Sequence, residues 1–455
     1  MKIQSINPYT NAVNAEIEIQ SSTQALDTCK SAYQAFAEWK KTDVNQRGEY
    51  LTRLAAVLRQ NKDEYARLAC IEMGKPVTQG KAEVEKCAWT AETYAKNAPA
   101  WLEDEPAEAD GLKHYVRYEP LGVVLGVMPW NFPFWQAIRY AVPAMAAGNT
   151  TVLRHSNAVP LCAQAMGNAF KLAGFPNGAF GLVISDHDTV AQLIASPSVA
   201  AVSFTGSENA GKHVAKLAAG SLKKCVLELG GSDAFIVLED ADVAKAAKAA
   251  AQARTINSGQ SCMCAKRFIV SEKIYEDFAN QFTAAMQALV VGDPLDGKTQ
   301  VGPLANAKQR DEIESQTSDA VQKGGRVLCG GKRTEPGFFY EPTVLSGATG
   351  SMRVWTEEVF GPVAPLYPAR YTEQAVQVAN NSEFGLDASV WTESIETGED
   401  VARQLECGVV FVNGVPNSDP RMPCGGIKKS GIGRELGKYG LREFCNVKAI
   451  NVYNP

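Results

Sequence analysis

The sequence has few histidines, no long apolar stretch and no large excess of either charge. Only 4 histidines occur among 455 residues, in no HExxH or HxH pattern, so a metal site built from histidine is not expected. The 45 basic and 50 acidic residues give a net charge of −5, which argues against nucleic acid or an anionic membrane surface as a partner. The longest apolar stretches, such as residues 121–128, are far too short to cross a membrane.

The cysteines also lack a recognisable pattern. The chain has 11 of them without CxxC spacing, which favours reduced thiols over a disulfide framework or a zinc site. The first residues contain neither the apolar segment of a signal peptide nor the arginines of a transit peptide, so we expect a cytoplasmic protein. Catalysis then has to use Cys, Glu, Asn, Lys or Arg side chains.

Strand-like runs and helical segments alternate along most of the chain. Residues 23–100 show helical periodicity with few breakers. From residue 121 to 228, apolar runs alternate with helical segments of roughly 10–15 residues, and a second such series begins at residue 234. The pattern predicts an α/β fold with two doubly wound parallel-sheet domains, of which the first suits a nucleotide.

Two segments have no core of their own. Residues 101–119 form an exposed, hairpin-like excursion, and the tail has strand character. We expect the tail to add to a sheet elsewhere, in this chain or on a neighbouring subunit. The predicted boundaries are 1–101 and 121–229 for the first domain, 230–430 for the second, and 102–120 and 445–455 for a β arm between subunits.

The segment RTINSGQSCMC, residues 254–264, combines a helix end, a glycine-containing turn and two cysteines. Such a junction can expose the thiol of Cys262 and place its backbone N–H beside a carbonyl under attack. The alternative is that Cys262 and Cys264 form a buried structural pair after the helix. The local features leave both interpretations open.

Glu228 stands near the end of the apolar run VLEL, just before Gly230 and Gly231. Desolvation at such a position raises the pKa of a carboxyl group and makes a general base. A strand-end glutamate that faces solvent is the alternative. The two glycines let the backbone approach a flat ligand closely.

Two further segments favour ligand contacts. The segment PWNFP holds Asn131 between prolines, where its amide can donate to a developing oxyanion or simply cap a loop. The segment SFTGS runs through Gly206 and Ser207 into a helix whose N-terminus suits an anion. A near match to the dinucleotide fingerprint at residues 431–437 has the wrong spacing and is interpreted as a turn before a helix.

Six motifs, PWNFP, FTGSxxxG, LELGG, NxGQxC, EEVFGPV and PCGGIKKSGIGRE, occur in that order over nearly the whole chain. Their order and spacing resemble those of the aldehyde dehydrogenase superfamily. The resemblance implies that family's fold, with an NAD(P)-binding domain at 1–101 and 121–229, a catalytic domain at 230–430 and an oligomerisation arm in a homodimer or homotetramer. It also implies oxidation of a small aldehyde to a carboxylic acid.

The resemblance further assigns roles to residues. Cys262 becomes the nucleophile that forms a thiohemiacetal and a thioester, Glu228 the base that activates water, and Asn131 with the Cys262 N–H the oxyanion hole. The implied cofactor contacts are Trp130, Asn131, Arg154, His155, Ser156, Asn157, Gly206, Ser207, Leu229, Glu358 and Phe360, with Glu358 on the nicotinamide ribose. The family's common Lys-Pro-Ser-Glu is Arg-His-Ser-Asn here. This change removes a carboxylate that repels a 2′-phosphate and Arg154 adds attraction, so NADP is admitted beside NAD, which the resemblance keeps as the first expectation.

The substrate prediction depends on Arg139, two helical turns after Asn131 and therefore expected in the aldehyde tunnel. Family members that oxidise succinic semialdehyde carry Arg there, which implies a short ω-carboxyaldehyde as substrate. The alternative is that Arg139 pairs with an acidic residue outside the tunnel. Ile256 stands where those members usually have a second Arg. The implied substrate contacts are Arg139, Phe132, Gln136, Ser261, Ser418 and Arg421.

Other functions remain open at this level. A broad short-chain aldehyde dehydrogenase is one alternative, and a thiol hydrolase that needs no cofactor is another. A CoA-acylating enzyme is disfavoured, because that class generally lacks the glutamate at the position of Glu228. The CxC spacing of Cys262 and Cys264 also occurs in succinate-semialdehyde members of the family, so a reversible inactivating disulfide between them is a further hypothesis.

Overall fold

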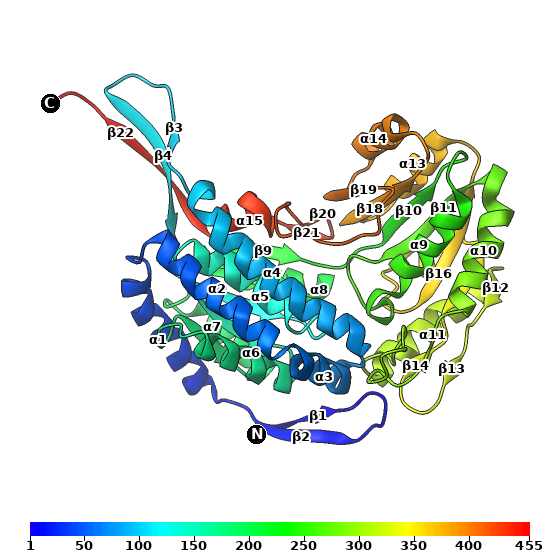
Figure 1. Ribbon diagram of the computed structural model, residues 1–455, viewed down its shortest axis with the longest axis horizontal. Coiled ribbons are helices and arrows are strands. Elements are labelled where there is room, and N and C mark those ends of the chain that lie inside the picture. The colour runs from blue at the N-terminus through cyan, green and yellow to red at the C-terminus, as the bar shows by residue number, and fades with distance from the viewer.

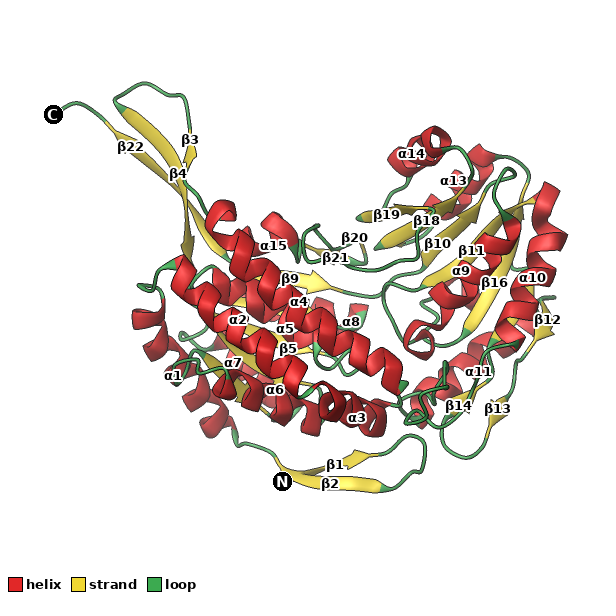
Figure 2. Cartoon of the chain, in the orientation of Figure 1, coloured by secondary structure: helices red, strands yellow, loops and turns green.

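The computed structural model describes residues 1–455, which form two α/β lobes, a protruding β arm and an N-terminal hairpin (Figures 1 and 2). The first lobe has a six-stranded sheet in the order β21-β9-β8-β5-β6-β7. Its strands are β5 (Val123–Met128), β6 (Thr150–His155), β7 (Phe180–Val183), β8 (Ala201–Thr205), β9 (Lys224–Glu228) and β21 (Gly431–Ile432). The first five are parallel to their neighbours, and β21 is antiparallel to β9. All residues of β5, β6 and β8 are buried, as continuous apolar strands require when helices cover both faces.

Helices cover this sheet on both sides, which confirms the doubly wound arrangement. One core contains residues of α2 (Val44–Gln60), α3 (Lys62–Met73), α4 (Val77–Trp101), α5 (Trp135–Ala146) and α6 (Pro160–Leu172). A separate core on the opposite face contains residues of α1 (Ser22–Trp39), α7 (His187–Ala195) and α8 (Glu208–Gly220). The helical periodicity of residues 23–100 therefore corresponds to four helices, of which α2, α3 and α4 share the core with α5.

A buried glutamate fixes the start of α5, the helix that follows the PWNFP segment. The carboxylate of Glu83 on α4 accepts hydrogen bonds from the backbone N–H groups of Phe134 and Trp135, both at 2.9 Å. It also forms an ion pair with Lys75, which is completely buried. A carboxylate at a helix N-terminus satisfies free N–H groups and interacts favourably with the helix dipole. Asn131 and Arg139 are thus held on a firmly anchored segment.

The second lobe has a seven-stranded sheet in the order β12-β15-β16-β11-β10-β18-β19, parallel except for the pair β12 and β15. Its strands are β10 (Asp233–Val237), β11 (Ala265–Ser271), β12 (Arg326–Cys329), β15 (Thr343–Ser346), β16 (Val363–Ala369), β18 (Asp387–Trp391) and β19 (Val409–Val412). Its helices are α9 (Val243–Thr255), α10 (Tyr275–Gln287), α11 (Ala307–Gln322), α12 (Arg353–Thr356), α13 (Thr372–Asn380) and α14 (Ile395–Gln404). The α/β fold with two such sheets is confirmed.

Short elements complete the chain. They are the two-residue strands β13 (Arg333–Thr334), β14 (Phe339–Tyr340), β17 (Phe384–Gly385) and β20 (Ile427–Lys428), and helix α15 (Gly437–Glu443). The N-terminal hairpin of β1 (Lys2–Ile6) and β2 (Val13–Glu18), which the sequence analysis did not anticipate, packs Ile17 against Ala163 and Ile184. No helix is both long and apolar enough to cross a membrane.

The arm is a three-stranded sheet that extends away from the first lobe (Figure 1). It contains β3 (Glu105–Pro106), β4 (Lys113–Pro120) and β22 (Cys445–Val452), in the order β22-β4-β3. The tail strand β22 pairs antiparallel with β4 from Cys445 opposite Pro120 to Val452 opposite Lys113. The tail therefore adds to a strand of its own chain, and the far edge of β22 stays unpaired.

Candidate active site

The loop that carries Cys262 has an unusual backbone. After α9 ends, a single turn of 3-10 helix places Asn257, Ser258 and Gly259 in succession at left-handed φ angles of 54°, 57° and 79°. A side chain on Gly259 would lie 2.4 Å from the carbonyl group of Gly361, so only glycine fits there. The buried guanidinium of Arg254 donates to the carbonyl oxygens of Gly259 and Ala265 and so fixes both ends of the loop. Strain of this kind persists only where the surroundings over-determine it.

Asn131 lies directly against this loop. Its side-chain nitrogen donates to the carbonyl oxygen of Gln260 at 3.1 Å, while the Asn257 amide donates to the Asn131 carbonyl oxygen at 2.7 Å. The amide of Asn131 has a second hydrogen, and the backbone N–H of Cys262 has no partner within the chain. A side-chain amide bound to the nucleophile loop and the backbone N–H of the nucleophile itself are donors of the kind that stabilise an oxyanion formed when a thiol adds to a carbonyl.

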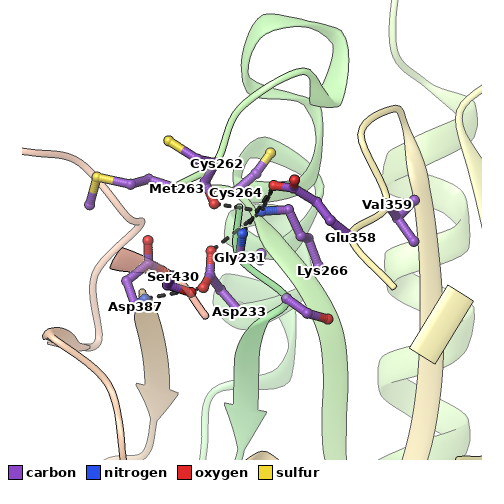
Figure 3. Close-up of polar contacts among 12 residues, drawn as sticks. Gly231, Asp233, Cys262, Met263, Cys264, Lys266, Glu358, Val359, Asp387 and Ser430 are labelled. Carbon is purple, nitrogen blue, oxygen red and sulfur yellow. Dashed lines mark hydrogen bonds and ion pairs between the residues drawn. The ribbon is translucent and has the colours of Figure 1, made fainter. Parts of the chain in front are cut away.

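The thiol of Cys262 is partly exposed and lines a cavity. Desolvation raises its pKa to about 12, although the positive charges of Arg139 and Lys266 oppose this shift. The Nζ of Lys266 donates to the carbonyl oxygen of Cys262. Cys264 instead is fully buried, and its thiol donates to the carbonyl oxygen of Arg254 at 3.6 Å. Both thiols are free here, and their two sulfur atoms point in different directions (Figure 3); the disulfide hypothesis stays a prediction.

Glu228 is the last residue of β9 and is almost completely buried. Burial raises the pKa of its carboxyl group to about 8, and the nearby Glu435 adds to the shift while Arg139 opposes it. The Nη2 of Arg139 lies 4.0 Å from one oxygen of Glu228, and the other oxygen has no hydrogen-bond partner. The raised pKa and the unpartnered oxygen fit a general base that accepts a proton near neutral pH.

Arg139 is strongly engaged by carboxylates. Its Nε forms an ion pair with Glu435, and its Nη2 donates to the hydroxyl of Thr205 at 3.3 Å. The side chain also lines the cavity with Cys262. Arg139 thus faces the cavity, as the substrate prediction requires, and at the same time pairs with an acidic residue, as the alternative requires. Its function as a substrate anchor stays a prediction.

A polar network connects the nucleophile loop with the first residues of β10 and β11 (Figure 3). One oxygen of Glu358 accepts the Gly231 backbone N–H at 3.1 Å and lies 3.3 Å from Nζ of Lys266. The same Nζ lies 3.5 Å from Asp233, whose carboxyl pKa burial raises to about 6. Lys266 therefore joins Glu358 to the carbonyl of Cys262. Sequence analysis missed Lys266, because nothing in the run AKRFIV distinguishes it from an ordinary strand lysine.

Nine of the eleven sequence-predicted cofactor residues lie at or just after the carboxyl ends of β5, β6, β8 and β9, where ligands bind in open α/β sheets, whereas Glu358 and Phe360 follow α12 in the second lobe. Arg154 and Asn157 both donate to the carbonyl oxygen of Ser185, at 2.9 and 3.1 Å, and retain a buried polar atom without a partner. Ser207 caps α8 after Gly206, and Trp130 packs edge-on against Phe360 with ring centroids 5.9 Å apart. A helix N-terminus, aromatic rings and orphaned polar atoms fit a dinucleotide.

Three further predicted cofactor residues have structural contacts. The His155 ring bonds the Pro133 carbonyl oxygen through Nε2 and the Ser156 backbone N–H through Nδ1, and burial lowers its pKa to about 4. His155 thus stays neutral and ties β6 to the PWNFP segment. Leu229 is buried below Gly211. Their contact with a cofactor remains a prediction.

The cavity has a volume of about 1160 Å³. Five of the six predicted substrate contacts line it, namely Phe132, Gln136, Arg139, Ser261 and Ser418. Arg421 does not, because it is exposed and pairs with Asp419 at 2.6 Å. Lys86 and Trp89 on α4 and Trp135 on α5 also line the cavity and were missed. The segment that forms α4 was interpreted only as part of a helical lead-in, and nothing in the sequence singled out Trp135 from the other apolar residues of its helix.

Comparison with known proteins defines the class to which this fold and site belong. The family model described as "Aldehyde dehydrogenase family" matches residues 1–450, so the chain belongs to this family. It is 43% identical over 454 residues to "Succinate-semialdehyde dehydrogenase [NADP(+)] 1" of Mycobacterium tuberculosis (strain ATCC 25618 / H37Rv), covering 99% of both chains. It is 44% identical over 451 residues to "Probable succinate-semialdehyde dehydrogenase [NADP(+)]" of Synechocystis sp., again with 99% of both covered.

A solved structure has the same fold. Succinic semialdehyde dehydrogenase from Streptococcus pyogenes, in complex with NADP+, has a TM-score of 0.97 and 36% identity. The match covers 99% of this chain and 100% of that one. The family and fold inferred from the six motifs are confirmed.

Proposed function

We propose that the protein oxidises succinic semialdehyde to succinate, with NADP+ as the hydride acceptor. The observation that supports it most directly is the thiol of Cys262, which opens into a large cavity on a loop with two free hydrogen-bond donors, its own backbone N–H and the second amide hydrogen of Asn131. The choice of succinic semialdehyde and of NADP+ is based on the names of the similar proteins. The 1–101 and 121–229 segments hold the cofactor in this proposal, and residues 230–430 supply the nucleophile.

The residues perform the chemistry in two stages. The sulfur of Cys262 adds to the aldehyde carbon, and the oxygen that becomes negative accepts hydrogen bonds from the Asn131 amide and the Cys262 N–H. A bound dinucleotide would supply the acceptor for the hydride that leaves this adduct to give the thioester. Glu228 then takes a proton from water, whose oxygen attacks the thioester; the acid leaves and the thiol is restored. Glu358, held by Gly231 and Lys266, is positioned to bind a ribose hydroxyl.

The choice of NADP over NAD reverses the first expectation from the sequence. The sequence already removes the carboxylate that repels a 2′-phosphate, since Asn157 replaces it and Arg154 adds a positive charge. The two curated relatives carry NADP in their names, and the solved relative binds it. NADP+ is therefore the cofactor we propose.

A kinetic panel tests both parts of the proposal. The kcat/KM for succinic semialdehyde is expected to exceed that for uncharged butanal by about 10- to 150-fold, the value of one charge-assisted hydrogen bond. NADP+ is expected to give a higher kcat/KM than NAD+, and added CoA to change nothing. Equal values for the two aldehydes would instead define a broad short-chain enzyme. Acid formation without any nicotinamide would identify a thiol hydrolase.

We also propose that the arm joins subunits into a homo-oligomer. Strand β22 has one unpaired edge, and Val447 and Tyr453 are 63% and 64% exposed. Exposed strand edges with apolar side chains favour pairing with another chain. Deletion of the last ten residues, which removes β22 except Cys445, is expected to reduce the sedimentation coefficient. A wild type that sediments as an active monomer contradicts this proposal.

A further inference from the structure

The substrate cavity contains a lysine that has no acidic partner. Lys86 lies on α4, and its Nζ donates to Oδ1 of Asn417 at 2.8 Å and to Oγ of Ser418 at 2.7 Å. It also lies 4.5 Å from the centroid of the Trp135 ring. All four side chains line the cavity with Cys262. No carboxylate lies within 4.0 Å of Nζ, so only neutral groups hold the ammonium.

The other cationic side chains that line the cavity are either paired with carboxylates or exposed to solvent. Arg139 is engaged by Glu435, and Arg59 forms ion pairs with Glu85 and Glu92. Lys248 lines the same cavity, but it is exposed and therefore hydrated. Ile256, which stands where related enzymes have a second Arg, contributes no charge. Lys86 is therefore the partly buried cation of this cavity that has no counter-ion.

We propose that Lys86, together with Ser418, binds the distal carboxylate of a short ω-carboxyaldehyde while Cys262 attacks its carbonyl. The inference rests on the proposed function and names the residue that selects the substrate. A carboxylate that replaces Asn417 beside Nζ supplies the missing counter-ion and turns an ammonium–amide hydrogen bond into a hydrogen-bonded ion pair. The Ser418 hydroxyl can then donate to the second carboxylate oxygen. Uncharged aldehydes gain none of these contacts.

The charge of Lys86 changes with pH near pH 8, within the range in which enzyme kinetics can be measured. Desolvation lowers the pKa of its ammonium to about 8. Arg139 on α5 adds to this shift, whereas Glu83 and Cys87 on α4 and Cys424 before α15 oppose it. Asp419 on the neighbouring loop also faces it but is already paired with Arg421. Above about pH 8 the free enzyme loses the proton and with it the attraction for a carboxylate.

The wild type gives a first test without mutation. The ratio of kcat/KM for succinic semialdehyde to kcat/KM for butanal cancels the titrations of Cys262 and Glu228, which both substrates share. This ratio is expected to be constant below about pH 7 and to fall above about pH 8. A ratio that stays constant up to pH 9 overturns the inference even if succinic semialdehyde is the better substrate.

Substitution gives the second test. Lys86→Met is expected to lower the ratio by about 10- to 150-fold, chiefly through the KM for succinic semialdehyde, and to abolish its fall with pH. Lys86→Arg is expected to retain most of the preference and to keep it at pH 9, because guanidinium does not titrate there. Lys248→Met removes an exposed lysine from the same cavity and serves as the matched control, with an unchanged ratio.

The outcomes separate the inference from the proposed function. If wild type shows no preference for succinic semialdehyde, the proposed function itself fails. If wild type shows the preference and Lys86→Met retains it, the function stands and Lys86 is not the anchor. Should Lys86→Met fail to fold, as circular dichroism would show, Ser418→Ala provides a milder loss of the same contact. The pH dependence of the wild-type ratio decides in either case.

Discussion

Replacement of Cys262 by alanine is expected to abolish aldehyde oxidation, with a loss of about 10⁴-fold or more in kcat. The reaction cannot begin without the sulfur, because Cys262 carries the only thiol among the side chains that line the cavity. The substitution removes only one sulfur atom from a partly exposed position, so the fold should tolerate it. Binding of the dinucleotide, followed by quenching of tryptophan fluorescence, is expected to remain intact.

Cys264→Ala is the matched control for this experiment. Cys264 lies two residues away on the same loop, but it is buried and donates to the carbonyl oxygen of Arg254. Its removal is expected to leave turnover within a few-fold of wild type, apart from the cost of a small cavity. Substantial turnover by Cys262→Ala, or equal losses in the two variants, would contradict the assignment of Cys262 as the nucleophile.

Replacement of Glu228 by glutamine is expected to have the second largest effect, a decrease of about 10²–10⁴-fold in steady-state kcat. The amide is nearly the same size as the carboxyl group but cannot accept a proton from water. The thioester on Cys262 should therefore accumulate, with one rapid equivalent of reduced cofactor followed by slow turnover. Mass spectrometry of the quenched enzyme would detect the acyl group on Cys262. Full steady-state turnover by this variant would exclude Glu228 as the base.

The pH dependence of the wild type should report the same carboxyl group. Only the ionised form of Glu228 accepts a proton, and the pKa raised to about 8 leaves that form in the minority at neutral pH. Where thioester hydrolysis limits turnover, kcat is therefore expected to rise with pH and level off above about pH 8. The glutamine variant should lose this rise.

Glu435→Gln offers a control that keeps the base itself. Glu435 raises the pKa of Glu228, whereas Arg139 lowers it. Loss of the Glu435 charge leaves Arg139 free to favour ionised Glu228, so the midpoint of the kcat profile is expected to move to lower pH with activity retained. A midpoint that does not move would show that Glu228 titrates independently of this pair.

Local sequence patterns sufficed for the parts of the protein that depend on neighbouring residues. The alternation of apolar runs with helical segments predicted both sheets, because a strand buried on both faces has to be continuously apolar. Short motifs made Cys262, Glu228 and Asn131 candidates, since a glycine turn, a strand end and a proline-bounded loop each act within a few residues, but they left a structural alternative open for each. The six ordered motifs then identified the family over the whole chain.

What the sequence by itself determined was the fold class and the family, and through the family it proposed the three residues that carry the chemistry. Only the tertiary structure decided their partners. The contact of Gly231 with Glu358 spans 127 residues and that of Lys86 with Ser418 spans 332, and no local periodicity records such pairs. It also showed that Arg139 is engaged by Glu435 whereas Lys86 keeps an uncompensated charge. Charge compensation and burial depend on which side chains the packed lobes bring together, and a linear pattern does not contain that information.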